Sequence, residues 1–184
     1  MNIHAFKENL GVSQLPPELE KLIEFQNERS GFEEYAQGFG MMIEDHSGIS
    51  SWSEDPAFLE RILPFAQANG SGSIYAFWKH GSEDLSHYPV VVFGDEGGVH
   101  VVAENFREFL RLLTYDTEIS VDFDEVYFYK DDDYEESEDH EAYMDWLKEK
   151  VNLDVEADPE AIITSAQQKY KSDFDAWFQL YYND

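Results

Sequence analysis

The 184-residue sequence predicts a single compact domain that combines helices with strand hairpins. Apolar residues make up 42% of the chain and aromatic residues 16%, which supplies a sizeable core and argues against a disordered chain. Short apolar runs joined by glycine-rich turns occupy the centre, and helical patterns lie before and after them. No internal repeat and no linker rich in Pro, Gly or Ser divides the sequence.

The N-terminal part predicts one helix followed by irregular segments. The helix is expected to follow Pro16-Pro17 and to end at Ser30-Gly31, because apolar residues recur there at intervals of three and four. Residues 32–43 are aromatic but interrupted by glycines, which favours a weak strand. A polar loop is expected over residues 44–54.

A second helix is expected to begin at Asp55-Pro56. Aspartate caps helix N-termini, and proline suits the first helical position. Its apolar face is expected to contain Phe58, Leu59 and Ile62. Pro64 should end it, since proline lacks the amide hydrogen that a helix interior needs.

Two hairpins are expected in the centre. In the first, the runs 65–68 and 73–79 flank a turn at residues 69–72, whose Asn and Gly residues accept positive φ angles. In the second, the runs 89–93 and 99–102 flank a turn at residues 94–98.

The run 73–79 is expected to be the central strand of the sheet. Ile74, Ala76 and Trp78 should point to one face, and Tyr75 and Phe77 to the other. Because both sets are apolar, the strand should be covered on both sides.

Three further helices are indicated. The first begins near Glu104, and its apolar stripe comprises Phe106, Phe109, Leu110 and Leu113. The second carries Tyr143, Met144, Leu147 and Val151 on one face. The last is long and is capped by Asp158-Pro159, and its apolar residues are Ile163, Ala166, Tyr170, Phe174, Trp177 and Tyr181.

The charge of the chain is strongly negative. Forty acidic residues and twelve basic ones give a formal net charge of −28. Such a surface repels phosphate backbones and anionic lipids, so neither nucleic-acid nor membrane binding is expected, whereas a basic partner would be attracted. Eight acids fall within residues 131–141, where mutual repulsion favours an exposed, mobile loop.

No catalytic, cofactor-binding or metal site is predicted. The chain has no cysteine, no His-Glu-x-x-His motif and no Gly-x-Ser-x-Gly motif. Gly70-Ser71-Gly72 starts like a dinucleotide fingerprint but precedes a strand, and the run 131–136 lacks the glycine of a calcium-binding EF-hand. His100 alternates with valines in a strand and is expected to face solvent or an edge.

Residues 65–113 contain three motifs in a fixed order. They are a glycine-rich hairpin and aromatic strand at residues 65–78, the segment Pro-Val-Val-Val-Phe-Gly-Asp-Glu-Gly at residues 89–97, and a helix that opens with Asn105-Phe106. As an ordered set, they resemble the core of the SUKH superfamily. The acidic stretch from Asp116 to Glu141 has no counterpart in this pattern.

The resemblance implies an α+β fold with a curved, mainly antiparallel sheet flanked by helices. Residues 1–184 would form a single SUKH-like domain, with a core at 55–114 and an acidic loop at about 116–141 before the C-terminal helices. Bacterial members of the superfamily are commonly immunity proteins that bind toxins, often nucleases, and eukaryotic members are linked to cell-wall regulation. The resemblance implies no catalytic residues and no cofactor.

Two functions from different classes therefore remain open. The first is neutralisation of a bacterial toxin by direct binding, and the second is an intracellular scaffold for a cellular regulator, without a toxin partner. An enzyme is disfavoured because no nucleophile, base and oxyanion donor occur together. A cytoplasmic location is expected, since no secretory signal and no apolar run of membrane-spanning length is present.

Two groups of acids are candidates for partner contacts. Asp95 and Glu96 lie at a hairpin tip, where they either contact a partner or only form the turn. The second group either guides a basic toxin or merely solubilises the chain, and it comprises Asp131, Asp132, Asp133, Glu135 and Glu136.

Overall fold

The computed structural model describes residues 1–29, 32–43, 47–155 and 158–182. Its centre is a five-stranded antiparallel sheet in which each strand pairs with the next along the chain. The strands are β1 (Gly40–Met41), β2 (Ile62–Gln67), β3 (Ile74–Trp78), β4 (Val90–Phe93) and β5 (Val99–Ala103). A separate antiparallel hairpin comprises β6 (Ile119–Val121) and β7 (Val126–Phe128).

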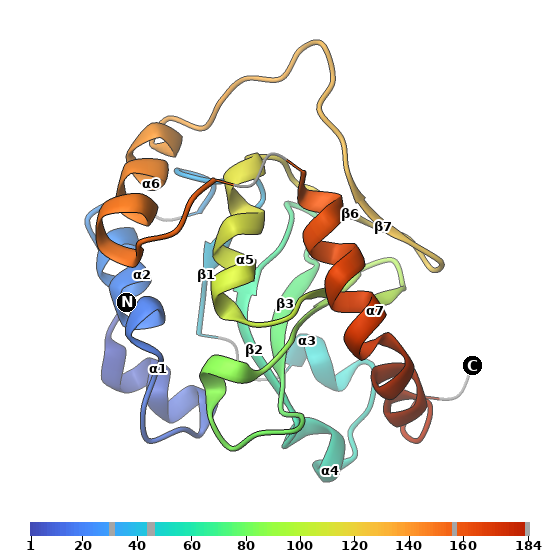
Figure 1. Ribbon diagram of the computed structural model, residues 1–184. Coiled ribbons are helices and arrows are strands. Elements are labelled where there is room, and N and C mark those ends of the chain that lie inside the picture. The colour runs from blue at the N-terminus through green and yellow to red at the C-terminus, as the bar shows by residue number, and fades with distance from the viewer. Residues whose placement is uncertain (30–31, 44–46, 156–157, 183–184) are drawn as a thin grey trace.

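Helices flank the sheet, which confirms the predicted α+β class (Figure 1). They are α1 (Ile3–Leu10), α2 (Pro17–Asn27), α3 (Ser47–Ser50), α4 (Pro56–Leu59), α5 (Phe106–Leu112), α6 (His140–Trp146) and α7 (Pro159–Phe178). Short 3-10 turns lie between β3 and β4 (Leu85–His87) and directly after α5 (Leu113–Tyr115). A π-helical turn at Leu147–Val151 extends α6.

The sheet has a hydrophobic core on each face. Tyr75 and Phe77 of β3 point into the first core, with residues of α1, α2, α5 and α6. The other side chains of β3 point into the second core, with residues of α3, α4 and α7. The predicted central strand and its alternation are therefore confirmed, because every side chain of β3 is buried.

Helix α7 joins the two cores along one edge of the sheet. Asp158 caps it as predicted, accepting a hydrogen bond from the amide of Glu160. Ile162 and Ile163 in its first turns belong to the first core, while later residues, including Trp177, belong to the second. The helix packs along β5 and covers that edge strand.

The second predicted helix is shorter than expected. Asp55 caps α4 at a distance of 2.8 Å from the amide of Ala57, but the helix ends at Leu59. Ile62 instead begins β2, opposite Trp78. Pro64 lies inside β2, where the register shifts, and such an irregularity tolerates a residue without an amide hydrogen.

Two further N-terminal predictions need correction. Residues 32–43 contain only the two-residue strand β1, because Gly38 adopts a left-handed conformation with φ of 71° and turns the chain. The predicted polar loop contains α3. The predicted end of α2 at Ser30-Gly31, and residues 44–46 of that loop, lie outside the described residues.

Candidate partner-binding surface

Asp95 and Glu96 lie at the exposed tip of the β4–β5 hairpin. Asp95 Oδ1 accepts hydrogen bonds from the hydroxyls of Ser73 (2.7 Å) and Ser71 (2.9 Å). The bond from Ser73, helped by that from Ser71, outweighs partial burial and lowers the pKa of Asp95. Asp95 therefore links the turn of this hairpin to the turn of the β2–β3 hairpin and stays ionised, while Glu96 has no side-chain partner in the part of the chain that the structure describes.

The β6–β7 hairpin packs on the same turn. The sequence showed no clean strand pattern here, so this hairpin was missed. A Cβ atom at Gly97 would lie 2.5 Å from the ring of Phe123, and one at Gly98 would lie 2.1 Å from the carbonyl oxygen of Asp122. The two glycines thus allow the tip of β6–β7 to rest directly on the backbone of the β4–β5 turn.

His100 supports this contact from within β5. The sequence predicted a side chain facing solvent or an edge, but His100 is only 5% exposed although β5 is an edge strand. Its Nε2 donates to the carbonyl oxygen of Asp122 at 2.7 Å. Burial lowers the pKa of His100, with the Asp122 contact opposing that shift.

Exposed aromatic side chains accompany the acids of the β6–β7 hairpin. The exposed fractions are 75% for Phe123, 38% for Tyr127 and 69% for Tyr129. Exposed acids Asp122, Asp124 and Glu125 form the turn between the strands. Aromatic residues among charges are typical of protein-binding surfaces, and the sequence prediction did not single these three out.

The second group of predicted acids lies on the segment between β7 and α6, which crosses the top of the molecule as a long arch in Figure 1. This segment, residues 129–139, contains neither helix nor strand. The side chains of Asp131, Asp132, Asp133, Glu135 and Glu136 are all exposed. Asp131 Oδ1 accepts a hydrogen bond from the amide of Asp133, which forms a local turn.

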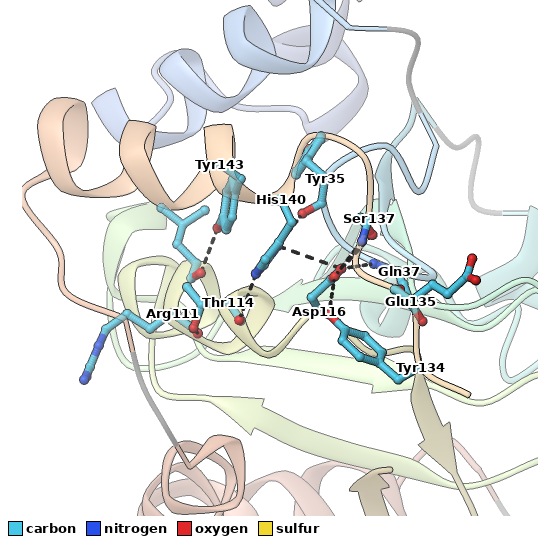
Figure 2. A network of polar contacts seen from close by, with 11 residues as sticks. Tyr35, Gln37, Arg111, Thr114, Asp116, Tyr134, Glu135, Ser137, His140 and Tyr143 are labelled. Atoms are coloured by element: carbon cyan, nitrogen blue, oxygen red, sulfur yellow. Dashed lines mark hydrogen bonds and ion pairs between the residues drawn. The ribbon is translucent and has the colours of Figure 1, made fainter. Parts of the chain in front are cut away.

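A buried carboxylate, Asp116, accepts hydrogen bonds from this segment and holds it in place (Figure 2). It accepts hydrogen bonds from the hydroxyl of Tyr134 (2.6 Å), from the amide (2.8 Å) and hydroxyl (2.7 Å) of Ser137, and from the amide of Gln37 (3.0 Å). Asp116 is 1% exposed. Burial raises its pKa, but the hydrogen bonds from Ser137 and Tyr134 together outweigh burial, so the pKa is lowered.

His140 secures the end of the segment at the start of α6. Its Nδ1 and Nε2 lie 2.9 Å from the carbonyl oxygen of Tyr35 and 3.1 Å from that of Thr114, and Nδ1 lies 3.8 Å from Asp116. The sequence prediction missed Tyr134, Ser137 and His140 as anchors. They could have been found as uncharged or aromatic positions within an otherwise acidic run.

The β6–β7 hairpin connects the two predicted groups without bringing them into contact. Its tip rests on the turn that carries Asp95 and Glu96, and its other end continues into the arch with the second group. Glu118, just before β6, accepts a hydrogen bond from the amide of Gly70 and attaches the hairpin to the β2–β3 turn. The acids thus follow one another along a single path over the end of the sheet.

Among the described residues, no three His, Asp or Glu side chains form a group that could hold a metal ion. No helix in the described ranges is long and apolar enough to cross a membrane.

A family model described as the SMI1/KNR4 family (SUKH-1) matches residues 2–112, more than half of the 184 residues. The chain belongs to this family. No curated protein and no solved structure matches it significantly.

The SMI1/KNR4 match ends at Leu112, the last residue of α5. It therefore includes the five-stranded sheet, Asp95 and Glu96, while the β6–β7 hairpin, the arch, α6 and α7 follow it. SUKH domains generally bind protein partners, toxins among them, and are generally non-catalytic. Most of the acidic path lies in the part of the chain that the family match does not include.

Proposed function

We propose that this protein is a cytoplasmic immunity protein that neutralises a bacterial toxin by direct binding, without catalysis. The observation that carries the proposal is the acidic path over the end of the sheet, from Asp95 and Glu96 through the β6–β7 hairpin to the arch. Buried contacts support this path, including those of Asp116 to Tyr134 and Ser137, while its carboxylates remain exposed.

The partner is proposed to present a basic surface. Of the 26 residues from Asp116 to Glu141, 13 are Asp or Glu and only Lys130 is Lys or Arg. Surfaces of opposite charge accelerate encounter and disfavour partners of the same charge. A nuclease fits this description, because its active site is built to receive phosphates and a carboxylate-rich protein can occupy or cover it.

For the experiment, the genes beside that of this protein are searched for one that encodes a toxin domain, which is then purified. The purified toxin domain is titrated with the full chain by calorimetry, and toxin-expressing cells are tested for growth with and without the chain. We expect a stoichiometric complex and restored growth, and neither effect with a toxin from an unrelated gene pair.

A complex that forms without restoring growth would contradict neutralisation. Absence of any neighbouring toxin gene, together with capture of a cellular regulator, would instead favour the scaffold function. Continued loss of growth in the presence of soluble chain would also count against the proposal.

A further inference from the structure

A groove of about 460 Å³ lies where the second core reaches the end of the sheet. Aromatic side chains from four separate parts of the chain meet two carboxylates there. The residues that matter for its chemistry are Trp52, Phe93, Asp95, Glu96, Phe123 and Tyr182.

The aromatic part of the groove is held in place by ring contacts. The centroid of the half-buried Trp52 ring lies 5.2 Å from that of Tyr182 and 5.6 Å from that of the buried Phe93. Phe178 of α7 packs behind both rings, at 5.9 Å from Trp52 and 5.3 Å from Tyr182. Because these rings are fixed before any partner arrives, contact with them costs little conformational entropy.

The acidic part of the groove is also oriented in advance. The hydroxyls of Ser71 and Ser73 fix the carboxylate of Asp95. Glu96 is exposed beside it, and Phe123 rests over Gly97 of the same turn. Negative charge therefore lies at the rim of a groove with aromatic walls.

We infer that this groove binds an arginine side chain of the basic partner protein. A guanidinium group stacks on aromatic faces and donates hydrogen bonds to carboxylates at the same time, and it loses less hydration than a lysine ammonium. This groove offers both kinds of contact. The inference rests on the proposed function for the identity of the partner, but not for the chemistry of the groove.

The test uses N-acetyl-arginine amide as the probe and assigned amide and indole signals in ¹H–¹⁵N spectra of the full chain as the readout. N-acetyl-citrulline amide, which has nearly the same shape without the charge, and N-acetyl-lysine amide are the comparison ligands. We expect the arginine probe to shift the signals of Trp52 and of Gly94–Gly97 in a saturable way. Citrulline should leave them unchanged, and lysine should bind more weakly.

Glu96→Gln should weaken binding of the arginine probe by about two- to fivefold, because an exposed ion pair is lost while no side-chain contact is disturbed. Trp52→Leu should weaken it by a similar factor through loss of the cation–π contact, with circular dichroism confirming the fold. Glu149→Gln removes one exposed charge on the turn after α6 and should leave binding unchanged.

Equal shifts by arginine and citrulline, or unchanged arginine binding by Glu96→Gln, would overturn the inference. No toxin enters this experiment, so such a result would leave the proposed function intact. Conversely, if the arginine probe binds here but no complex with a toxin forms, the inference about the groove stands and the proposed function is contradicted.

Discussion

Asp116 shows how a single residue can organise the charged part of this protein. It lies in a left-handed backbone conformation with φ of 52° and accepts hydrogen bonds from residues before and after it in the chain. Nothing in its local sequence distinguishes it from 39 other acids, since the chain contains 40 in total. What distinguishes it is its 1% exposure, which only tertiary contacts determine.

Asp116→Asn is expected to lower the free energy of unfolding by about 2–4 kcal/mol at pH 7, because the substitution replaces a buried, charge-assisted acceptor and places an amide donor among donors. The lowered pKa of Asp116 means that its ionised form stabilises the fold above the pKa of the unfolded carboxyl, about 4. That stability is lost as the pH falls through the lower pKa of the folded state. The difference between wild type and variant should therefore shrink as the pH falls from about 7 to about 3.

Urea unfolding at several pH values measures this difference. Asp132→Asn, at an exposed position of the arch, is the matched control and should change stability by less than about 0.5 kcal/mol. A difference that stays constant with pH would contradict an ionised Asp116.

Among the helices and strands, those whose burial leaves a clear apolar pattern were predicted from the sequence, and those that depend on tertiary contacts were not. Strand β3 was predicted correctly, including which side chains point to which face of the sheet. Burial on both faces requires a continuous apolar run, and successive side chains of a strand point to opposite faces. Its neighbour β2 was predicted only in part, because pairing of Ile62 with Trp78 overrides the local signal of Pro64. The β6–β7 hairpin was missed because several of its apolar residues, such as Phe123, are exposed and obey no burial pattern.

Gly98→Ala should detach the β6–β7 hairpin. Gly98 has a φ of 82°, and an added Cβ would lie 2.1 Å from the carbonyl oxygen of Asp122. We expect a loss of about 1–3 kcal/mol in the free energy of unfolding and faster exchange of the Asp122 amide, which donates to the carbonyl oxygen of Glu125 within the hairpin.

Gly11→Ala provides the control for backbone strain alone. Gly11 has a φ of 64°, but an added Cβ would meet nothing within 4 Å. It should cost about 1–2 kcal/mol without accelerating exchange in the hairpin. Equal exchange rates in the two variants would show that the glycine contact does not hold the hairpin.

For the whole molecule, the net charge of −28 is distributed unevenly. Residues 1–92 have 14 acids and 5 bases, a net charge of −9, and residues 93–184 have 26 acids and 7 bases, a net charge of −19. This asymmetry was readable from the sequence, as was the family resemblance. The arrangement of the acids along one path was not, because it depends on the tertiary contacts of Gly97, Gly98 and Asp116.

Charge on the arch is expected to accelerate binding of a basic toxin. Replacing Asp131, Asp132, Asp133, Glu135 and Glu136 by Asn or Gln should slow association several-fold at low salt and change dissociation little. The effect should diminish as salt rises, since charges are screened beyond about 8 Å at physiological ionic strength. Folding stability should be kept or should improve, because like charges are removed from an exposed segment.

Stopped-flow association kinetics over a range of salt concentrations test this expectation. The control replaces five exposed glutamates elsewhere, Glu24, Glu54, Glu60, Glu83 and Glu149, so that the net charge changes equally. If both variants slow association to the same extent, overall charge rather than the arch guides the partner. If neither does, electrostatic steering is excluded.

The position of α7 has a consequence for how the chain folds during synthesis. All five strands of the central sheet leave the ribosome before α7 is made, so the second core initially lacks its main cover and β5 presents an open edge. Exposed apolar faces and unpaired strand edges make nascent chains prone to aggregation. A fragment limited to residues 2–112 would share this weakness permanently, so the family-matched region is not expected to be an independent folding unit in this protein.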